Sequence, residues 1–100
     1  MGTMTTGVRV PTDADGWLDP SDVHKPGRYG RATNARVINS RGNRWLVTAP
    51  DGLGCSLDPD VHSVTEHDDG TITVSPSVDL SRFRPGGWHG WLRRGVFEEA

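Results

Sequence analysis

Short runs in which apolar and polar residues alternate recur along the chain, separated by glycine, proline and aspartate. The clearest run is 71–75, where Ile72 and Val74 alternate with threonine and serine. This period of two predicts a strand with one buried face. We expect Pro76 to end that strand, because proline cannot donate to a sheet ladder. Comparable runs predict further strands at 8–10, 29–39, 44–49, 61–67, 88–92 and 96–98, with a short strand or loop at 55–57.

Turn residues between the runs predict how the strands connect. Asp69-Gly70 supports the positive backbone angles that a tight hairpin needs. Gly42-Asn43 and Arg93-Arg94-Gly95 mark two further hairpin turns. No long window has helical periodicity, and Pro20–Val23 is expected to form at most one helical turn. The fold class is therefore all-β: a small antiparallel sandwich or partly open barrel with long loops.

The chain of 100 residues is long enough for a single domain with a thin core, since only 33% of its residues are hydrophobic. We assign residues 1–7 to a flexible N-terminal arm and residues 8–100 to one β domain. Turn residues dominate the segment 12–27. Within it, we expect Trp17 and Leu18 to pack the loop onto the core.

Charge and cysteine content narrow the function classes. The formal net charge of -2 provides no field that would attract nucleic acid. Ten of the eleven basic residues are arginine, which is typical of codon bias in a GC-rich genome. The single cysteine, Cys55, cannot form an internal disulfide. No apolar run reaches the ~18–20 residues that span a membrane, and the N-terminus lacks an apolar signal core. We expect a protein made in the cytoplasm, with no membrane partner.

Residues with metal-binding or nucleophilic side chains are scattered. A zinc site usually draws on closely spaced ligand pairs, and no such pair occurs among Cys55, His24, His62, His67 and His89. A Cys–His nucleophile with Asp58 or Asp60 as orienter lacks the context that lowers a thiol pKa. We therefore expect no metal, no cofactor and no enzymatic activity.

Two charged clusters have both a structural and a functional interpretation. The first could bind Ca²⁺ but lacks the frame of an EF-hand, so we expect its members to form turns: Asp13, Asp15, Asp19 and Asp22. The second mixes arginine with Tyr29 and Trp45, as modules that bind single-stranded nucleic acid do. Its members alternate between strand faces in an acidic chain, which favours a solvated face instead: Arg28, Arg31, Arg36, Arg41 and Arg44.

The sharpest constellation is Trp88-His89-Gly90-Trp91. In a strand, Trp88 and Gly90 share one face, and His89 and Trp91 share the other. Glycine beside a tryptophan indicates close approach of another backbone or ring. One interpretation is a tryptophan core plug with His89 bonded to a loop carbonyl. The other is an exposed ring that anchors a protein partner, since tryptophan and arginine are enriched at binding hot spots. The candidate partner-binding residues are Trp88, His89, Trp91, Arg93, Arg94, Arg82 and Arg84.

The segment 69–97 resembles a family of small uncharacterised domains encoded in bacteriophage and prophage genomes. Those domains end in the pattern SPS(I/V), a gap, and WHG(W/F)(I/L)xxG. The matching residues are interpreted first as framework: Ser75, Pro76, Ser77, Trp88, His89, Gly90 and Gly95. Some relatives carry extra cysteines that could bind metal. This chain has only Cys55, so no metal site is carried over.

The resemblance implies a phage origin. Three functional hypotheses are considered. The first is a non-enzymatic virion component, either a capsid decoration or a minor head or tail protein. It would dock through protein–protein contacts on other virion subunits or on further copies of itself, and it would be located in the virion. The second is a phage-encoded inhibitor of a host defence protein. The third, a metal-dependent enzyme, has the least support from the sequence.

Overall fold

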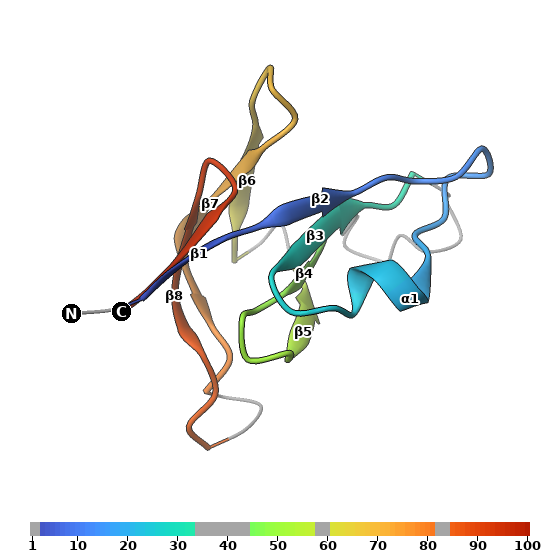
Figure 1. Ribbon diagram of the computed structural model, residues 1–100. Helices are drawn as coiled ribbons and strands as arrows, with labels where there is room; N and C mark the ends of the chain where they lie inside the picture. The colour runs from blue at the N-terminus through green and yellow to red at the C-terminus, as the bar shows by residue number, and fades with distance from the viewer. Residues whose placement is uncertain (1–2, 34–44, 58–60, 82–84) are drawn as a thin grey trace.

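Two β-sheets pack against each other in the computed structural model, with one short helix at the side of the smaller sheet (Figure 1). The structure describes residues 3–33, 45–57, 61–81 and 85–100. The prediction of a small all-β fold with antiparallel sheets is confirmed.

The larger sheet has five strands in the order β1-β9-β8-β7-β6, and every neighbouring pair is antiparallel. The hairpins predicted at Asp69-Gly70 and at Arg93-Arg94-Gly95 are both confirmed, because they join β6 to β7 and β8 to β9. The strands are β1 (Met4–Thr6), β6 (Ser63–Glu66), β7 (Ile72–Asp79), β8 (His89–Arg93) and β9 (Val96–Glu99).

The smaller sheet has four strands in the order β2-β3-β4-β5. Its β2–β3 pair is parallel, and its other two pairs are antiparallel. Within the described residues, β3 covers the start of the predicted strand 29–39 and ends at Arg31, and residues 34–39 lie outside them. The turn at Gly42-Asn43 lies outside the described residues. The strands are β2 (Val8–Val10), β3 (Arg28–Arg31), β4 (Trp45–Thr48) and β5 (Gly54–Ser56).

The single helical turn predicted at Pro20–Val23 is confirmed as α1. Its N-terminus is capped by Asp19, whose carboxylate accepts a hydrogen bond from the Ser21 amide at 2.8 Å. This bond and a second from the Ser21 hydroxyl lower the pKa of Asp19. Buried Val23 faces the smaller sheet, where its carbonyl accepts a 2.6 Å hydrogen bond from the Thr48 hydroxyl. The helix thereby covers part of the outer side of that sheet.

One shared core lies between the two sheets. The predicted alternation in 71–75 is confirmed, because Ile72 and Val74 are both buried. Trp88 meets Phe97 edge to face, with ring centroids 5.8 Å apart. The smaller sheet contributes Tyr29, Val47, Ala49 and Leu57, and the larger one Ile72, Val74, Val78, Leu80, Trp88, Leu92 and Phe97.

The first strand corrects the assignment of residues 1–7 to a flexible arm. Residues 4–6 form β1 and pair with β9. The chain then crosses directly into the smaller sheet as β2. Gly7 is the crossing point: its amide donates to the Gly95 carbonyl at 2.7 Å, while the next amide, that of Val8, donates to Gly27 at 2.9 Å. A Cβ at Gly7 would lie 2.6 Å from the Gly95 oxygen, so glycine is required there.

Pro76 does not end its strand as predicted. β7 continues through it to Asp79, and the Ser75–Pro76 peptide bond is cis. The pairing with β6 stops at Ser75, and the register with β8 shifts between Val74 and Val78. Pro76 therefore occupies the one stretch of β7 where the ladders on both sides are interrupted, and the missing amide proton leaves no ladder bond unmade.

The loop after β2 partly contradicts the expectation for Trp17 and Leu18. Leu18 packs against β3, with a methyl carbon 2.8 Å from where a Cβ on Gly30 would stand. Trp17 instead remains 38% exposed. The Asp13 carboxylate accepts hydrogen bonds from the Asp15 and Trp17 amides, at 2.9 and 3.0 Å. Asp13 thus forms a turn, as predicted, and the turn holds the Trp17 ring at the surface.

Candidate docking surface

Strand β8 separates the tryptophan-rich segment into two faces, as its alternation predicts. Trp88 is only 8% exposed and belongs to the core. A Cβ at Gly90 would lie 2.7 Å from the Trp88 ring and would also collide with the Glu98 carbonyl of β9. The predicted close approach at Gly90 is therefore confirmed. The core-plug interpretation holds for the Trp88 ring.

The opposite face of β8 presents the other aromatic residue to solvent. Trp91 is half-buried, and the His89 ring lies beside it with ring centroids 6.4 Å apart. The Arg93 guanidinium lies over the Trp91 ring, 5.1 Å from its centroid. Arg93 also reaches Glu98 of β9, with Nη1 and Oε2 3.4 Å apart. We call these four residues, His89, Trp91, Arg93 and Glu98, the outer β8 face.

The position of the outer β8 face makes it rigid. β8 is the central strand of the five, with β9 on one side and β7 on the other. Trp91 is directly opposite Glu98, and Arg93 is opposite Val96. The side chains therefore rise from a backbone that is paired with β9 from Gly90 to Arg93 and with β7 on either side of Trp91, at Gly90 and Leu92. A surface that is ordered before binding loses less conformational entropy when a partner arrives.

The other arginines of the candidate set lie elsewhere. Arg94 lies in the β8–β9 turn with φ of 46°, and Gly95 follows with φ of 77°, as in a primed hairpin turn. The Arg94 amide donates to the Thr73 hydroxyl at 3.0 Å. Arg94 lines an open hollow of about 370 Å³ near the β6–β7 turn, together with Asp69 and Glu66. Arg82 and Arg84 lie outside the described residues.

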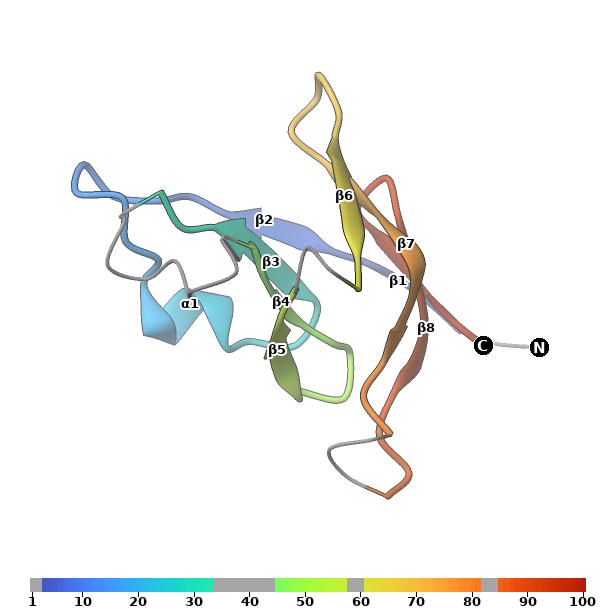
Figure 2. The ribbon, with the colours of Figure 1, turned by 180° about the vertical axis from the view of Figure 1, so that it is seen from behind.

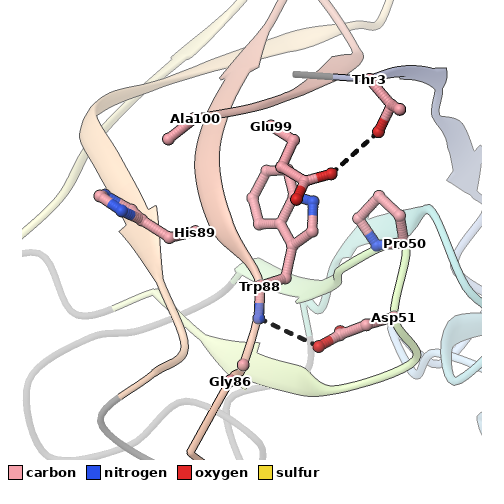
Figure 3. Close-up of a pocket in the computed structure, with 9 residues that line it drawn as sticks. Thr3, Pro50, Asp51, Gly86, Trp88, His89, Glu99 and Ala100 are labelled. Atoms are coloured by element: carbon pink, nitrogen blue, oxygen red, sulfur yellow. Dashed lines mark hydrogen bonds between the residues drawn. The ribbon is translucent and has the colours of Figure 1, made fainter. Parts of the chain in front are cut away.

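A second hollow, of about 450 Å³, lies beside Trp88 where the two sheets approach each other (Figure 3). Asp51, in the turn after β4, accepts a hydrogen bond from the Trp88 amide at 3.1 Å. Across the hollow, the Thr3 hydroxyl donates to Glu99 at 2.9 Å. Both carboxylates are thus already engaged by the chain. Their contacts hold β1 against β9 and the β4–β5 turn against β8.

The cysteine and histidines do not assemble a reactive centre. Cys55 packs against the core, and burial raises the pKa of its thiol to about 11. The thiol is therefore neutral at pH 7, which is the opposite of an activated nucleophile. His62 donates to the Ser77 carbonyl at 2.8 Å, whereas His67 lies 2.7 Å from the Thr73 hydroxyl. Among the described residues, no three His, Cys, Asp or Glu side chains are grouped to hold a metal ion. Asp58 and Asp60 lie outside them.

One contact between the two sheets has no signal in the sequence. Arg9 of β2 and Glu66 of β6 form an ion pair at 2.7 Å, and Arg31 of β3 approaches the same carboxylate at 3.6 Å. The Trp45 ring lies beneath both guanidiniums, 5.2 Å from Arg9 and 6.0 Å from Arg31. The hydrogen bond from Arg9 lowers the pKa of Glu66. No sequence signal pairs Arg9 with Glu66, because 57 residues separate them.

The arginine cluster proposed for nucleic-acid binding is only partly described. Arg28 donates to the Pro26 carbonyl at 3.0 Å, and Arg31 is turned toward Glu66. Both described members therefore contact the protein itself. The other three members, Arg36, Arg41 and Arg44, lie outside the described residues.

Comparisons with known proteins add no family to this picture. The chain matches no protein-family model, and no curated protein or solved structure is significantly similar to it. Within the described part of the chain, no helix has the length and apolar character needed to cross a membrane.

Proposed function

We propose that the chain is a non-enzymatic bacteriophage virion component, a capsid decoration or minor head or tail protein, that docks on another virion subunit through the outer β8 face. The observation that carries the docking role is the partly exposed Trp91 held between His89 and Arg93. The phage assignment rests on the resemblance of residues 69–97 to small phage-encoded domains. The docking role and the phage origin thus have separate support.

The chemistry of this face suits a protein partner. Tryptophan and arginine are the residue types most enriched among binding hot spots, because both combine a large apolar contact area with a polar group. The cation of Arg93 over Trp91 is balanced by Glu98, so the face carries little net charge. We therefore expect a partner surface that covers the indole ring and that offers hydrogen bonds to its rim.

The second candidate is an inhibitor of a host protein, and one observation favours it. Trp17 is 38% exposed next to the carboxylates of Asp13 and Asp15. The loop that carries them extends away from the five-stranded sheet in both views (Figures 1 and 2). An acidic surface with an aromatic residue fits a basic protein surface. The two candidates thus use opposite ends of the molecule.

The test measures the chain in purified particles of the phage that encodes it. We expect many copies per particle for the wild type and a marked loss of incorporation for Trp91→Ala. Trp17→Ala is the matched control, since it removes a surface tryptophan from the other end, and it should be incorporated normally. Absence of the chain from particles would overturn the virion proposal. A host protein captured by the wild type but not by Trp17→Ala would then support the inhibitor.

A further inference from the structure

The four edges of the two sheets differ in charge. β2 carries Arg9 and β6 carries Glu66, and these two side chains join at 2.7 Å. Charged side chains that point inward are a common protection of sheet edges against unwanted pairing. The other two edges, β1 with the sequence Met-Thr-Thr and β5 with Gly-Cys-Ser, carry no charged residue. The protein therefore leaves one uncharged edge on each sheet.

The hydrogen bonds around β1 show which of its backbone groups are not paired with β9. The Glu99 amide donates to the Thr3 carbonyl at 2.8 Å, and the Gly7 amide donates to Gly95 at 2.7 Å. In an antiparallel pair, alternate residues face the partner strand. The backbone groups of Met4 and Thr6 therefore point away from β9, and no hydrogen-bond partner for them lies in the described part of the chain. The Met4 side chain is 69% exposed.

The β5 edge has the same alternation of paired and outward backbone groups. The Leu57 amide donates to the Trp45 carbonyl at 3.0 Å, and the Ala49 amide donates to Leu53 at 2.9 Å. Residues 53, 55 and 57 thus face β4, and the backbone groups of Gly54 and Ser56 point outward. Both uncharged edges therefore present outward backbone groups from two residues spaced two apart.

An apolar hollow lies next to the β5 edge. It has a volume of about 290 Å³, and its lining includes Val23 of α1 and Leu46 of β4. On β5 it is bordered by the two small residues Gly54 and Ser56. Neither backbone nor packing requires glycine at 54, because its φ lies outside the left-handed region and a Cβ would come no closer than 3.4 Å to the Thr48 hydroxyl. The small side chains leave the hollow open.

We propose that β1 of one copy adds to β5 of a second copy as a fifth antiparallel strand, with Met4 opposite Ser56 and Thr6 opposite Gly54. Residues directly opposite each other project from the same face of a sheet. Met4 would therefore project on the face that carries Gly54 and Ser56, beside the hollow that Leu46 lines. The exposed methionine side chain fills that hollow, and the outward backbone groups on both edges become paired.

This contact joins two different surfaces, so it is heterologous. Every copy in a row offers a free β1 at one end and a free β5 at the other. Such an interface produces a ring if the rotation closes and a filament if it does not. Met4 projects on the same face of the larger sheet as Glu98, its opposite residue on β9, but Trp91, His89 and Arg93 take no part in the pairing. Trp91→Ala therefore distinguishes the self-association from docking on a virion subunit.

Sedimentation velocity of the full chain over a wide range of concentrations tests the pairing. We expect the wild type to show species above the monomer that grow with concentration, and Met4→Glu to remain monomeric, because a charge on a strand edge opposes pairing. Val61→Glu is the matched control, since Val61 is 54% exposed and lies on neither edge. A monomeric wild type, or equal behaviour of the two glutamate variants, would overturn the proposal.

A second set of variants fills the hollow with side chains of β5 itself. Gly54→Val should remain folded by circular dichroism and lose self-association, and Ser56→Lys serves the same purpose if the valine variant does not fold. Met4→Glu keeps an intact β5, and Gly54→Val keeps an intact β1. Their equimolar mixture should form a 1:1 dimer and nothing larger. A mixture that stays monomeric contradicts the β1–β5 pairing. Trp91→Ala should associate like the wild type.

Discussion

Trp88 and Trp91 lie three positions apart in the sequence, just before β8 and within it, yet they occupy opposite environments. Trp88 is 8% exposed and contacts Phe97 in the core. Trp91 points to the other side and contacts Arg93 and His89 at the surface. Because the residue type is the same, the difference comes from the alternation of side chains between the two faces of an extended backbone. Neighbouring positions of one extended segment thus place one tryptophan in the core and the other at the surface.

The largest expected effect separates the two tryptophans directly. Trp88→Ala should lower the free energy of unfolding by about 3–5 kcal/mol, because it removes a large buried ring and leaves a cavity. Trp91→Ala should lower it by less than about 1 kcal/mol, since its ring is partly solvated. Equilibrium denaturation of both variants measures the difference. Equal losses would mean that the two faces of β8 do not differ as described.

The next effect tests the close approach of the Trp88 ring to Gly90. Gly90→Ala should lower the free energy of unfolding by about 3 kcal/mol, because the added carbon meets the Trp88 ring and the Glu98 carbonyl. Gly54→Ala is the control, with an expected change within about 0.5 kcal/mol, since its Cβ makes only ordinary contacts. Thermal melts of the pair suffice. A Gly90→Ala protein as stable as the control would remove the reason for glycine at this position.

A smaller effect concerns the ion pair that joins the sheets at their rim. Glu66→Gln should lower the free energy of unfolding by about 0.5–1 kcal/mol at pH 7, as expected for a partly exposed pair. The pKa of Glu66 lies below its ordinary value of 4.5 in the folded protein. Its stabilisation is therefore complete above pH 4.5 and lost as the pH falls through the lowered pKa.

Stability of both proteins as a function of pH checks this sign. The difference between wild type and Glu66→Gln should be constant above pH 4.5 and shrink as the pH falls below it. A difference that grows as the pH falls would contradict the ion pair as the source of the stabilisation.

The smallest expected effect concerns the contact of Trp91 with Arg93 at the surface. Arg93→Ala should change the free energy of unfolding by no more than about 0.5 kcal/mol. It removes the cation above Trp91, so heteronuclear NMR should show the indole resonance of Trp91 moving while that of Trp88 stays in place. Movement of both resonances would indicate that the substitution disturbs the strand rather than the surface contact.

Turns and strand faces could be predicted from the sequence, because they depend on a few adjacent residues. The Asp69-Gly70 turn and the alternation of Ile72 and Val74 were predicted, because a turn type and a strand face depend on adjacent residues. The expectation that Pro76 ends β7 was wrong for a non-local reason. Whether proline interrupts a ladder depends on the neighbouring strands, and here both ladders are already interrupted.

The candidate site was likewise predicted only where adjacent residues decide the structure. Alternation separated Trp88 from Trp91, but it could not decide which of the two faces the core, since that depends on how the sheets stack. It also could not reveal the contact between Arg9 and Glu66, which forms only when the sheets meet. The exposure of Trp17 was missed as well, because the turn around Asp13 directs its ring outward.

The pairing of β1 with β9 has a consequence for the order of folding. Met4 pairs with Glu98, so this contact closes nearly the whole chain into a loop, whereas β6–β7 and β8–β9 form across short turns. Contacts between distant residues form late, because a long loop must be closed before they contribute any free energy. We expect the C-terminal hairpins to build the folding nucleus and β1 to join last. Substitutions in β1 should then speed unfolding and leave the folding rate almost unchanged.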